Sequence, residues 1–126
     1  MKQDEFMFAN TIKSEWVHPT EFPSMKGHSV VAIDLETCDT DLKTMGPGWA
    51  KGIGKVIGIA ISDGQFSAYY PIDHDGGGNM DRKTVLKYIK SICEDGSIDK
   101  VFHNAQYDIG WLWRLGIEVK GYIHDT

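Results

Sequence analysis

Two kinds of hydrophobic pattern follow one another along the chain. Residues 28–36 contain the apolar run Val30–Ile33 and the apolar Leu35, which predicts a strand that is apolar on both faces and central in a sheet. Residues 55–62 and 65–72 are two further strand-like runs, joined by Asp63 and Gly64, a pair typical of a hairpin turn. We therefore expect three consecutive strands in the first half of the chain.

Helical spacing appears in the second half of the chain. The predicted helix at 81–93 has one apolar face, made of Val85, Leu86, Ile89, Ile92 and Cys93. A short strand at 100–103 leads to a second helix at about 105–115, which stops at Gly116. Residues 118–126 begin like one more strand. The predicted order is β-β-β-α-β-α-β, which indicates an α/β fold with a mixed sheet and helices packed on it.

The first 27 residues differ from the rest. They contain two prolines and no sustained periodicity, so we expect residues 1–27 to be an extended N-terminal arm whose Trp16 and Phe22 dock on the domain. Residues 28–126 would then form one domain. The polar, glycine-rich stretch at 38–54 is expected to be a flexible connection between strands.

Composition narrows the class of protein. The chain has 126 residues, of which 41% are hydrophobic and 25% charged, which is typical of a soluble globular protein. No apolar run approaches the ~20 residues that cross a bilayer, and the N-terminus is too acidic for a signal peptide. Cys38 and Cys93 are isolated thiols, which favours a reducing cytoplasm. The net charge of −5 argues against a general nucleic-acid binder, but not against an enzyme that meets nucleic acid through bound cations.

Two acids interrupt the end of the first strand. Because side chains alternate along a strand, Asp34 and Glu36 project to the same side. Two neighbouring carboxylates repel each other, and a bound divalent cation removes that repulsion. Oxygen ligands favour Mg²⁺ or Mn²⁺ over zinc. Acids spaced two apart also arise by chance, as at Asp39 and Asp41, so the pair alone leaves both interpretations open.

A third acid lies on the second helix. A helical wheel divides residues 105–115 into an apolar face, Ala105, Ile109, Trp111, Leu112, Trp113 and Leu115, and an opposite face, Gln106, Tyr107, Gly110 and Arg114. Asp108 falls on the apolar face, where an unpartnered carboxylate is costly. Asn104 is a candidate N-cap, and the positive end of the helix helps to keep Asp108 ionised. Asp108 could instead pair with a lysine at the rim, but we favour an acidic site shared with Asp34 and Glu36. Such a site is typical of two-metal phosphoryl chemistry, in which no side chain acts as nucleophile.

These residues resemble a known family. "DLET", with Asp34 and Glu36, resembles the D-x-E motif of the DEDD 3′–5′ exonucleases, and "HNAQYD", with Asn104 and Asp108, resembles their N-x-x-x-D motif. The phrases "AYYPIDHD" and "GIEVKGYIHDT" are similar to the proofreading exonuclease domain of family A DNA polymerases, particularly bacteriophage-type ones. The resemblance covers about residues 28–126. It implies an RNase H-like five-stranded fold and removal of nucleotides from the 3′ end of single-stranded DNA.

The resemblance also implies a role for each matching residue. Asp34 and Glu36 would bind the first of two divalent cations, Mg²⁺ or Mn²⁺, and Asp34 would bridge to the second. Asp108 would reach the second cation directly or through water. Substrate contacts at the terminal nucleotides are implied for Thr37, Leu42, Asn104 and Tyr107. For Tyr107, a surface aromatic packed on the helix is the alternative.

One part of the family pattern is expected outside this sequence. The third motif, Y-x-x-x-D, supplies a fourth carboxylate and a tyrosine, and no such motif follows Asp108. We therefore expect a truncated domain that lacks its C-terminal helices, binds metal weakly, has little turnover and associates with itself through exposed apolar surface. Its other partner would be the remainder of the polymerase chain, with no membrane involved, in the host cytoplasm if phage-encoded. A non-catalytic DNA-binding or scaffold module and an exoribonuclease relative are the alternatives.

Overall fold

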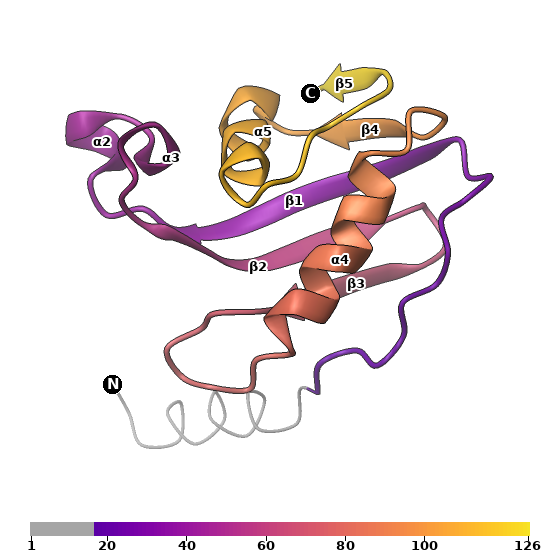
Figure 1. The fold of residues 1–126 in the computed structure, drawn as a ribbon, viewed down its shortest axis with the longest axis horizontal. Coiled ribbons are helices and arrows are strands. Elements are labelled where there is room, and N and C mark those ends of the chain that lie inside the picture. Colours follow the sequence, from indigo (N-terminus) through magenta and orange to yellow (C-terminus); the bar gives the residue numbers. More distant parts are fainter. Residues whose placement is uncertain (1–16) are drawn as a thin grey trace, which may run out of the picture.

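A five-stranded mixed sheet forms the centre of the computed structural model, which describes residues 17–126 (Figure 1). Its strands are β1 (Val30–Cys38), β2 (Lys55–Ser62), β3 (Ser67–Pro71), β4 (Asp99–Phe102) and β5 (Ile123–Asp125). They lie in the order β3-β2-β1-β4-β5. The β1–β2 and β2–β3 pairs are antiparallel, and the β1–β4 and β4–β5 pairs are parallel. The sheet is mixed and β1 lies at its centre, so the predicted α/β fold is confirmed.

Two longer helices cover the sheet. They are α4 (Arg82–Cys93), which runs across β2 and β3, and α5 (Ala105–Arg114), which follows β4 (Figure 1). Asp81 caps α4 by accepting a hydrogen bond from the backbone N–H of Thr84. The buried residues of α4 are Val85, Ile89, Ile92 and Cys93, as its apolar spacing predicts. No helix within residues 17–126 is long and apolar enough to span a membrane.

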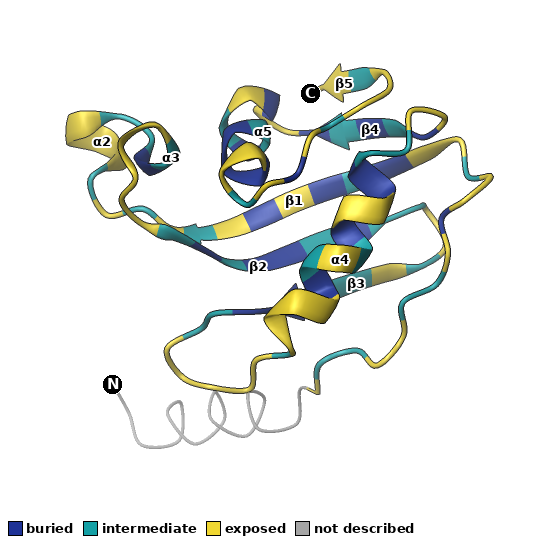
Figure 2. Cartoon of the chain, in the orientation of Figure 1, coloured by how far each residue is buried: buried dark blue, intermediate teal, exposed yellow. Residues whose placement is uncertain are grey.

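One face of β1 is buried and the other is open. Val31, Ile33 and Leu35 belong to the core, whereas Asp34 and Glu36 are exposed (Figure 2). Val30 and Ala32 lie on the open face, and Val30 is 39% exposed. The strand is apolar on both faces as far as Ile33, as predicted, but within residues 17–126 its second face is not buried. The run Val30–Ile33 is apolar throughout, so its composition hides the alternation.

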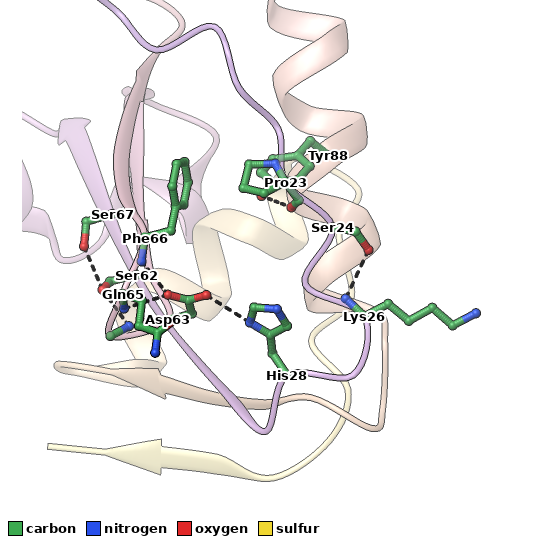
Figure 3. Close-up of polar contacts among 11 residues, drawn as sticks. Pro23, Ser24, Lys26, His28, Ser62, Asp63, Gln65, Phe66, Ser67 and Tyr88 are labelled. Atoms are coloured by element: carbon green, nitrogen blue, oxygen red, sulfur yellow. Dashed lines mark hydrogen bonds and ion pairs between the residues drawn. The ribbon is translucent and has the colours of Figure 1, made fainter.

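The N-terminal arm packs onto the core through aromatic side chains. Phe22 stacks on Tyr70 with a 5.2 Å distance between ring centroids and meets the edge of Tyr88 at the same distance. The Tyr88 hydroxyl donates to the backbone carbonyl of Pro23 at 2.6 Å (Figure 3). The predicted docking of Phe22 is confirmed, and Trp16 lies outside the described residues.

The predicted hairpin between β2 and β3 is also present. Asp63 closes its turn by accepting hydrogen bonds from the backbone N–H groups of Gln65 and Phe66, at 2.8 and 2.6 Å. The same carboxylate lies 3.0 Å from His28 at the end of the arm (Figure 3). Asp63 therefore connects the arm to the hairpin.

Candidate active site

The open face of β1 presents the first two acids. Asp34 and Glu36 lie opposite Ala60 and Gly58 of β2, so their side chains share one face, as their spacing predicts. The strand does not end with them, because it continues through an irregularity between Glu36 and Thr37. Both carboxylates are exposed. A ligand could therefore reach them from the open face.

Asp108 approaches the same strand from the first turn of α5. Its side chain is buried, with 4% of its surface exposed. Burial raises its pKa to about 6, and the negative charges of Asp34 and Glu36 add to that rise. A hydrogen bond from the backbone N–H of Leu35 lowers the pKa and so offsets part of this rise. Asp108 is therefore close enough to the first two acids for their charges to act on it.

The carboxyl group of Asp108 is only partly satisfied. Its Oδ2 atom is buried without a hydrogen-bond partner. No lysine or arginine of residues 17–126 forms an ion pair with it, so the rim salt bridge considered as the alternative is absent from that region. A buried polar atom without a partner is costly. A cation near Asp34, Glu36 and Asp108 would both satisfy this oxygen and reduce the mutual repulsion.

The oxygen donors fit a hard divalent cation such as Mg²⁺ or Mn²⁺. In the structure as it stands, no three His, Cys, Asp or Glu side chains within residues 17–126 are placed so that they could hold a metal ion together. A shallow hollow of about 660 Å³ covers the open face next to Asp34. Tyr69 and His103 also line it. Space for a ligand therefore adjoins one of the three acids.

Thr37 and Tyr107 meet through their hydroxyl groups. Thr37 Oγ1 and the Tyr107 hydroxyl are 3.0 Å apart, and the Tyr107 hydroxyl donates to Asp39 Oδ2 at 2.8 Å. Asp39 Oδ2 also accepts from the backbone N–H of Gly48 at 3.0 Å. Tyr107 is therefore more than a surface aromatic. Asp39, whose spacing from Asp41 is that of a chance pair, is the centre of this cluster.

The segment 39–54 is folded against α5. It contains the short helices α2 (Leu42–Met45) and α3 (Gly48–Lys51), so the prediction of a flexible connection is wrong. The indole ring of Trp49 lies on Gly110, where any side chain would collide with it. Gly110 is consequently buried, and Trp113 is 66% exposed. The helical wheel places both residues on the wrong face because it cannot include the packing of a distant segment.

The remaining two candidates are exposed. Asn104 has a left-handed backbone with φ of 58°, which asparagine tolerates better than most residues. It precedes α5 as expected, but its side chain makes no cap hydrogen bond. Asp125 of β5 accepts from the first N–H of the helix, that of Ala105, at 3.2 Å instead. Leu42 begins α2 and is 40% exposed.

A family model described as 3′–5′ exonuclease matches residues 20–126, which is most of the chain. The chain belongs to the 3′–5′ exonuclease domains of family A DNA polymerases. A relative of this exonuclease domain is the DNA-directed DNA polymerase of Pseudomonas phage M6, 40% identical over 113 residues that cover 86% of this chain and 17% of the relative. Another is DNA polymerase I of Pseudomonas aeruginosa, 31% identical over 102 residues, with coverage of 77% and 10%. The exonuclease domain thus spans less than a fifth of either relative.

Solved structures support the fold of the exonuclease domain. RNase D of Trypanosoma brucei has a TM-score of 0.58 and 21% identity, covering 82% of this chain and 32% of its own. Brucella melitensis NrnC with bound Mg²⁺ has a TM-score of 0.53 and 19% identity, covering 82% and 45%. At this identity the likeness concerns the fold, and the predicted RNase H-like α/β architecture is confirmed.

Two features of the site were missed by sequence reasoning. Asp39 lies in a glycine-rich stretch, where an aspartate is expected in a turn for local reasons. Asp125 lies 20 residues after the N–H group that it caps. No local pattern identifies either contact, because each depends on how distant segments of the exonuclease domain pack.

Proposed function

We propose that this domain is a metal-dependent 3′–5′ exonuclease that hydrolyses phosphodiester bonds at a DNA 3′ end. The proposal rests on the electrostatics of Asp108. Its carboxyl group is buried, has an oxygen without a partner, and is influenced by the charges of Asp34 and Glu36. In a domain of the polymerase exonuclease family, this combination favours a site that is completed by cations.

The three acids would share the cations as follows. Asp34 and Glu36 would bind one cation, and Asp34 and Asp108 would bind a second. Two divalent cations, when bound, supply the positive charge that favours ionisation of an attacking water and stabilises the leaving oxygen. Asp108 must lose its proton before both of its oxygens can serve as ligands. Its elevated pKa means that protons and cations compete for this group near pH 6.

The neighbouring residues would orient the terminal nucleotides. Asn104 has a side-chain amide that is not used to cap α5, so it can hydrogen-bond to a substrate. Leu42 offers an exposed apolar side chain against which a base can pack. The hydrogen bonds that Tyr107 donates to Asp39 and shares with Thr37 hold α5 and the end of β1 in one arrangement. A substrate would therefore meet a preorganised surface.

We further propose that the domain acts together with the remainder of a polymerase polypeptide, in the cytoplasm where the DNA is copied. The net charge of −5 provides little general attraction for DNA. Positive charge at the site would come from the bound cations. RNA is the second candidate substrate, because the same two motifs also occur in exoribonucleases.

The test is degradation of 5′-labelled single-stranded DNA in Mg²⁺ or Mn²⁺. It uses the 126-residue chain and a fusion that appends the sequence following the aligned region of the phage M6 polymerase. We expect stepwise shortening from the 3′ end by the fusion, and little by the 126-residue chain. Asp34→Ala should reduce the rate of the fusion by roughly 100-fold or more, since it removes the shared ligand.

Glu118→Ala is the matched control, because it removes an exposed acid outside the site. It should leave the rate unchanged. A labelled RNA of the same sequence distinguishes the second substrate. A folded fusion that shortens DNA equally well with and without Asp34 would contradict the metal assignment. A folded fusion that binds DNA but never shortens it would favour the non-catalytic alternative.

A further inference from the structure

A tyrosine on β3 reaches the strand position opposite Glu36. Glu36 pairs with Gly58 of β2, and Gly58 pairs in turn with Pro71 of β3. The hydroxyl group of Tyr69 lies over Gly58, so closely that any side chain at Gly58 would collide with it. Glycine at this position therefore allows the hydroxyl to approach Glu36 across the open face of the sheet.

The Tyr69 hydroxyl is held in place from its other side. It lies 2.6 Å from His74 Nε2, and the two rings meet edge to face with a 5.8 Å distance between centroids. The backbone of His74 is itself fixed by Asn79. The N–H of His74 donates to Asn79 Oδ1 at 2.8 Å, and Asn79 Nδ2 donates to the carbonyl of His74 at 2.9 Å. The partner of Tyr69, His74, therefore lies in a loop whose backbone is held by two hydrogen bonds to Asn79.

Tyr69 and Glu36 also interact electrostatically. Burial raises the pKa of the Tyr69 hydroxyl, and the negative charge of Glu36 raises it further. A phenol is protonated at neutral pH in any case and can act as a donor. A protonated hydroxyl beside a carboxylate that is half of a metal-binding pair can fix which way the carboxylate oxygens point.

We infer that Tyr69, supported by His74, is a positioning residue that donates a hydrogen bond to Glu36 and orients this carboxylate for the cation. The inference rests on the proposed function, since it assigns Glu36 to a metal site. Groups that hydrogen-bond to metal ligands restrict the ligands' orientation and increase metal affinity. Neither Tyr69 nor His74 would contact the cation or the substrate.

Mn²⁺ binding to the 126-residue chain tests this role directly. Electron paramagnetic resonance measures free Mn²⁺ in a titration, without any need for turnover. Tyr69→Phe removes only the hydroxyl and keeps the ring over Gly58. We expect it to weaken Mn²⁺ binding roughly 10-fold, within the range measured for second-layer groups. Its thermal unfolding temperature should stay close to that of the parent chain.

Tyr70→Phe is the matched control. Tyr70 is the next residue of β3, and its hydroxyl donates to the backbone carbonyl of Glu21 at 2.8 Å, on the buried side of the sheet. This variant should lose stability and keep the Mn²⁺ affinity of the parent. His74→Ala should weaken binding in the same way as Tyr69→Phe. His74→Gln, which retains a nitrogen donor, should restore part of it.

The outcomes separate the two proposals. If the parent chain binds no Mn²⁺, or if Glu36→Gln leaves binding unchanged, the metal site is wrong and the role of Tyr69 is wrong with it. If Glu36→Gln weakens binding while Tyr69→Phe behaves like the parent, only the positioning role is overturned. Equal loss of affinity in Tyr69→Phe and Tyr70→Phe would indicate a general effect on the fold and would also overturn that role.

Discussion

Asp108 combines structural cost and proposed function in one side chain. Its Oδ2 has no partner, and burial, together with the charges of two neighbouring acids, raises its pKa to about 6. When the pKa of a carboxylic acid is higher in the folded state than in the unfolded state, its protonated form makes the larger contribution to the free energy of unfolding. As the pH rises from about 4 through 6, that contribution is lost. Without cations, the folded chain is therefore less stable at neutral pH, where Asp108 is ionised, than it would be with a neutral side chain at this position.

Asp108→Asn should consequently stabilise the metal-free chain at pH 7.5 and have little effect at pH 4. The expected gain is about 3 kcal/mol, from the free energy that corresponds to the raised pKa. Urea unfolding at the two pH values measures it. Saturating Mn²⁺ should cancel the advantage, because the parent carboxylate then has a partner. An equal effect at both pH values would show that charge is not the cause.

Sequence reasoning predicts the faces on which individual acids lie better than it predicts their contacts. The alternation of β1 and the apolar face of α5 are local patterns, so the common face of Asp34 and Glu36 and the burial of Asp108 follow from spacing alone. The cap of α5 is a long-range contact. Asparagine is a favourable N-cap residue, yet Asn104 leaves the N–H of Ala105 to Asp125. Propensity cannot reveal a competing group that arrives from another strand.

At the scale of secondary structure, the regular elements are predicted more accurately than the connection 39–54. The bounds of β2, Lys55–Ser62, agree with the prediction because alternation and turn signals coincide there. Glycines and polar residues dominate this connection, and such a composition predicts a flexible segment. Trp49 packs this connection onto α5. Its indole ring occupies the space that a side chain at Gly110 would fill. An absent side chain produces no hydrophobic pattern to detect.

Gly110→Ala tests this contact. In an exposed helical position alanine is stabilising relative to glycine, but here the added methyl group would collide with the ring of Trp49. We expect a loss of roughly 1–3 kcal/mol, as for other overpacked sites, and faster proteolysis after Lys43 or Lys51. Thermal unfolding and limited trypsin digestion measure the two effects.

Gln106→Ala is the control for this prediction. Gln106 lies on the exposed side of the same helix, so alanine should be neutral or slightly stabilising there. If Gly110→Ala is as stable as Gln106→Ala and equally resistant to trypsin, the packing of Trp49 on α5 is not tight.

At the scale of the whole molecule, the open face of the sheet presents apolar side chains to solvent. The residues that line its hollow include Ala32, Ala60 and Val101. Exposed apolar surface of this kind favours association between molecules. We expect the chain to associate reversibly at micromolar concentrations. Sedimentation velocity over a range of concentrations measures the effect.

Val101→Lys should shift that equilibrium towards the monomer. Val101 lies on the open face opposite Ala32, so a lysine there places charge in the hollow without entering the core. Lys87→Ala, on the exposed side of α4, is the control and should leave the association unchanged. A parent chain that remains monomeric at all concentrations would contradict the prediction.

The hydrogen bond between Asp125 and Ala105 has a consequence for how the chain tolerates cleavage. The antiparallel part of the sheet, β1 to β3, makes no use of β5. A protease that removed the residues after Ile123 would leave this part paired while removing the hydrogen bond to the first N–H of α5. Such a nicked molecule would still resemble the intact one by its overall strand content, yet the helix that carries its third acid would have lost the cap at its start.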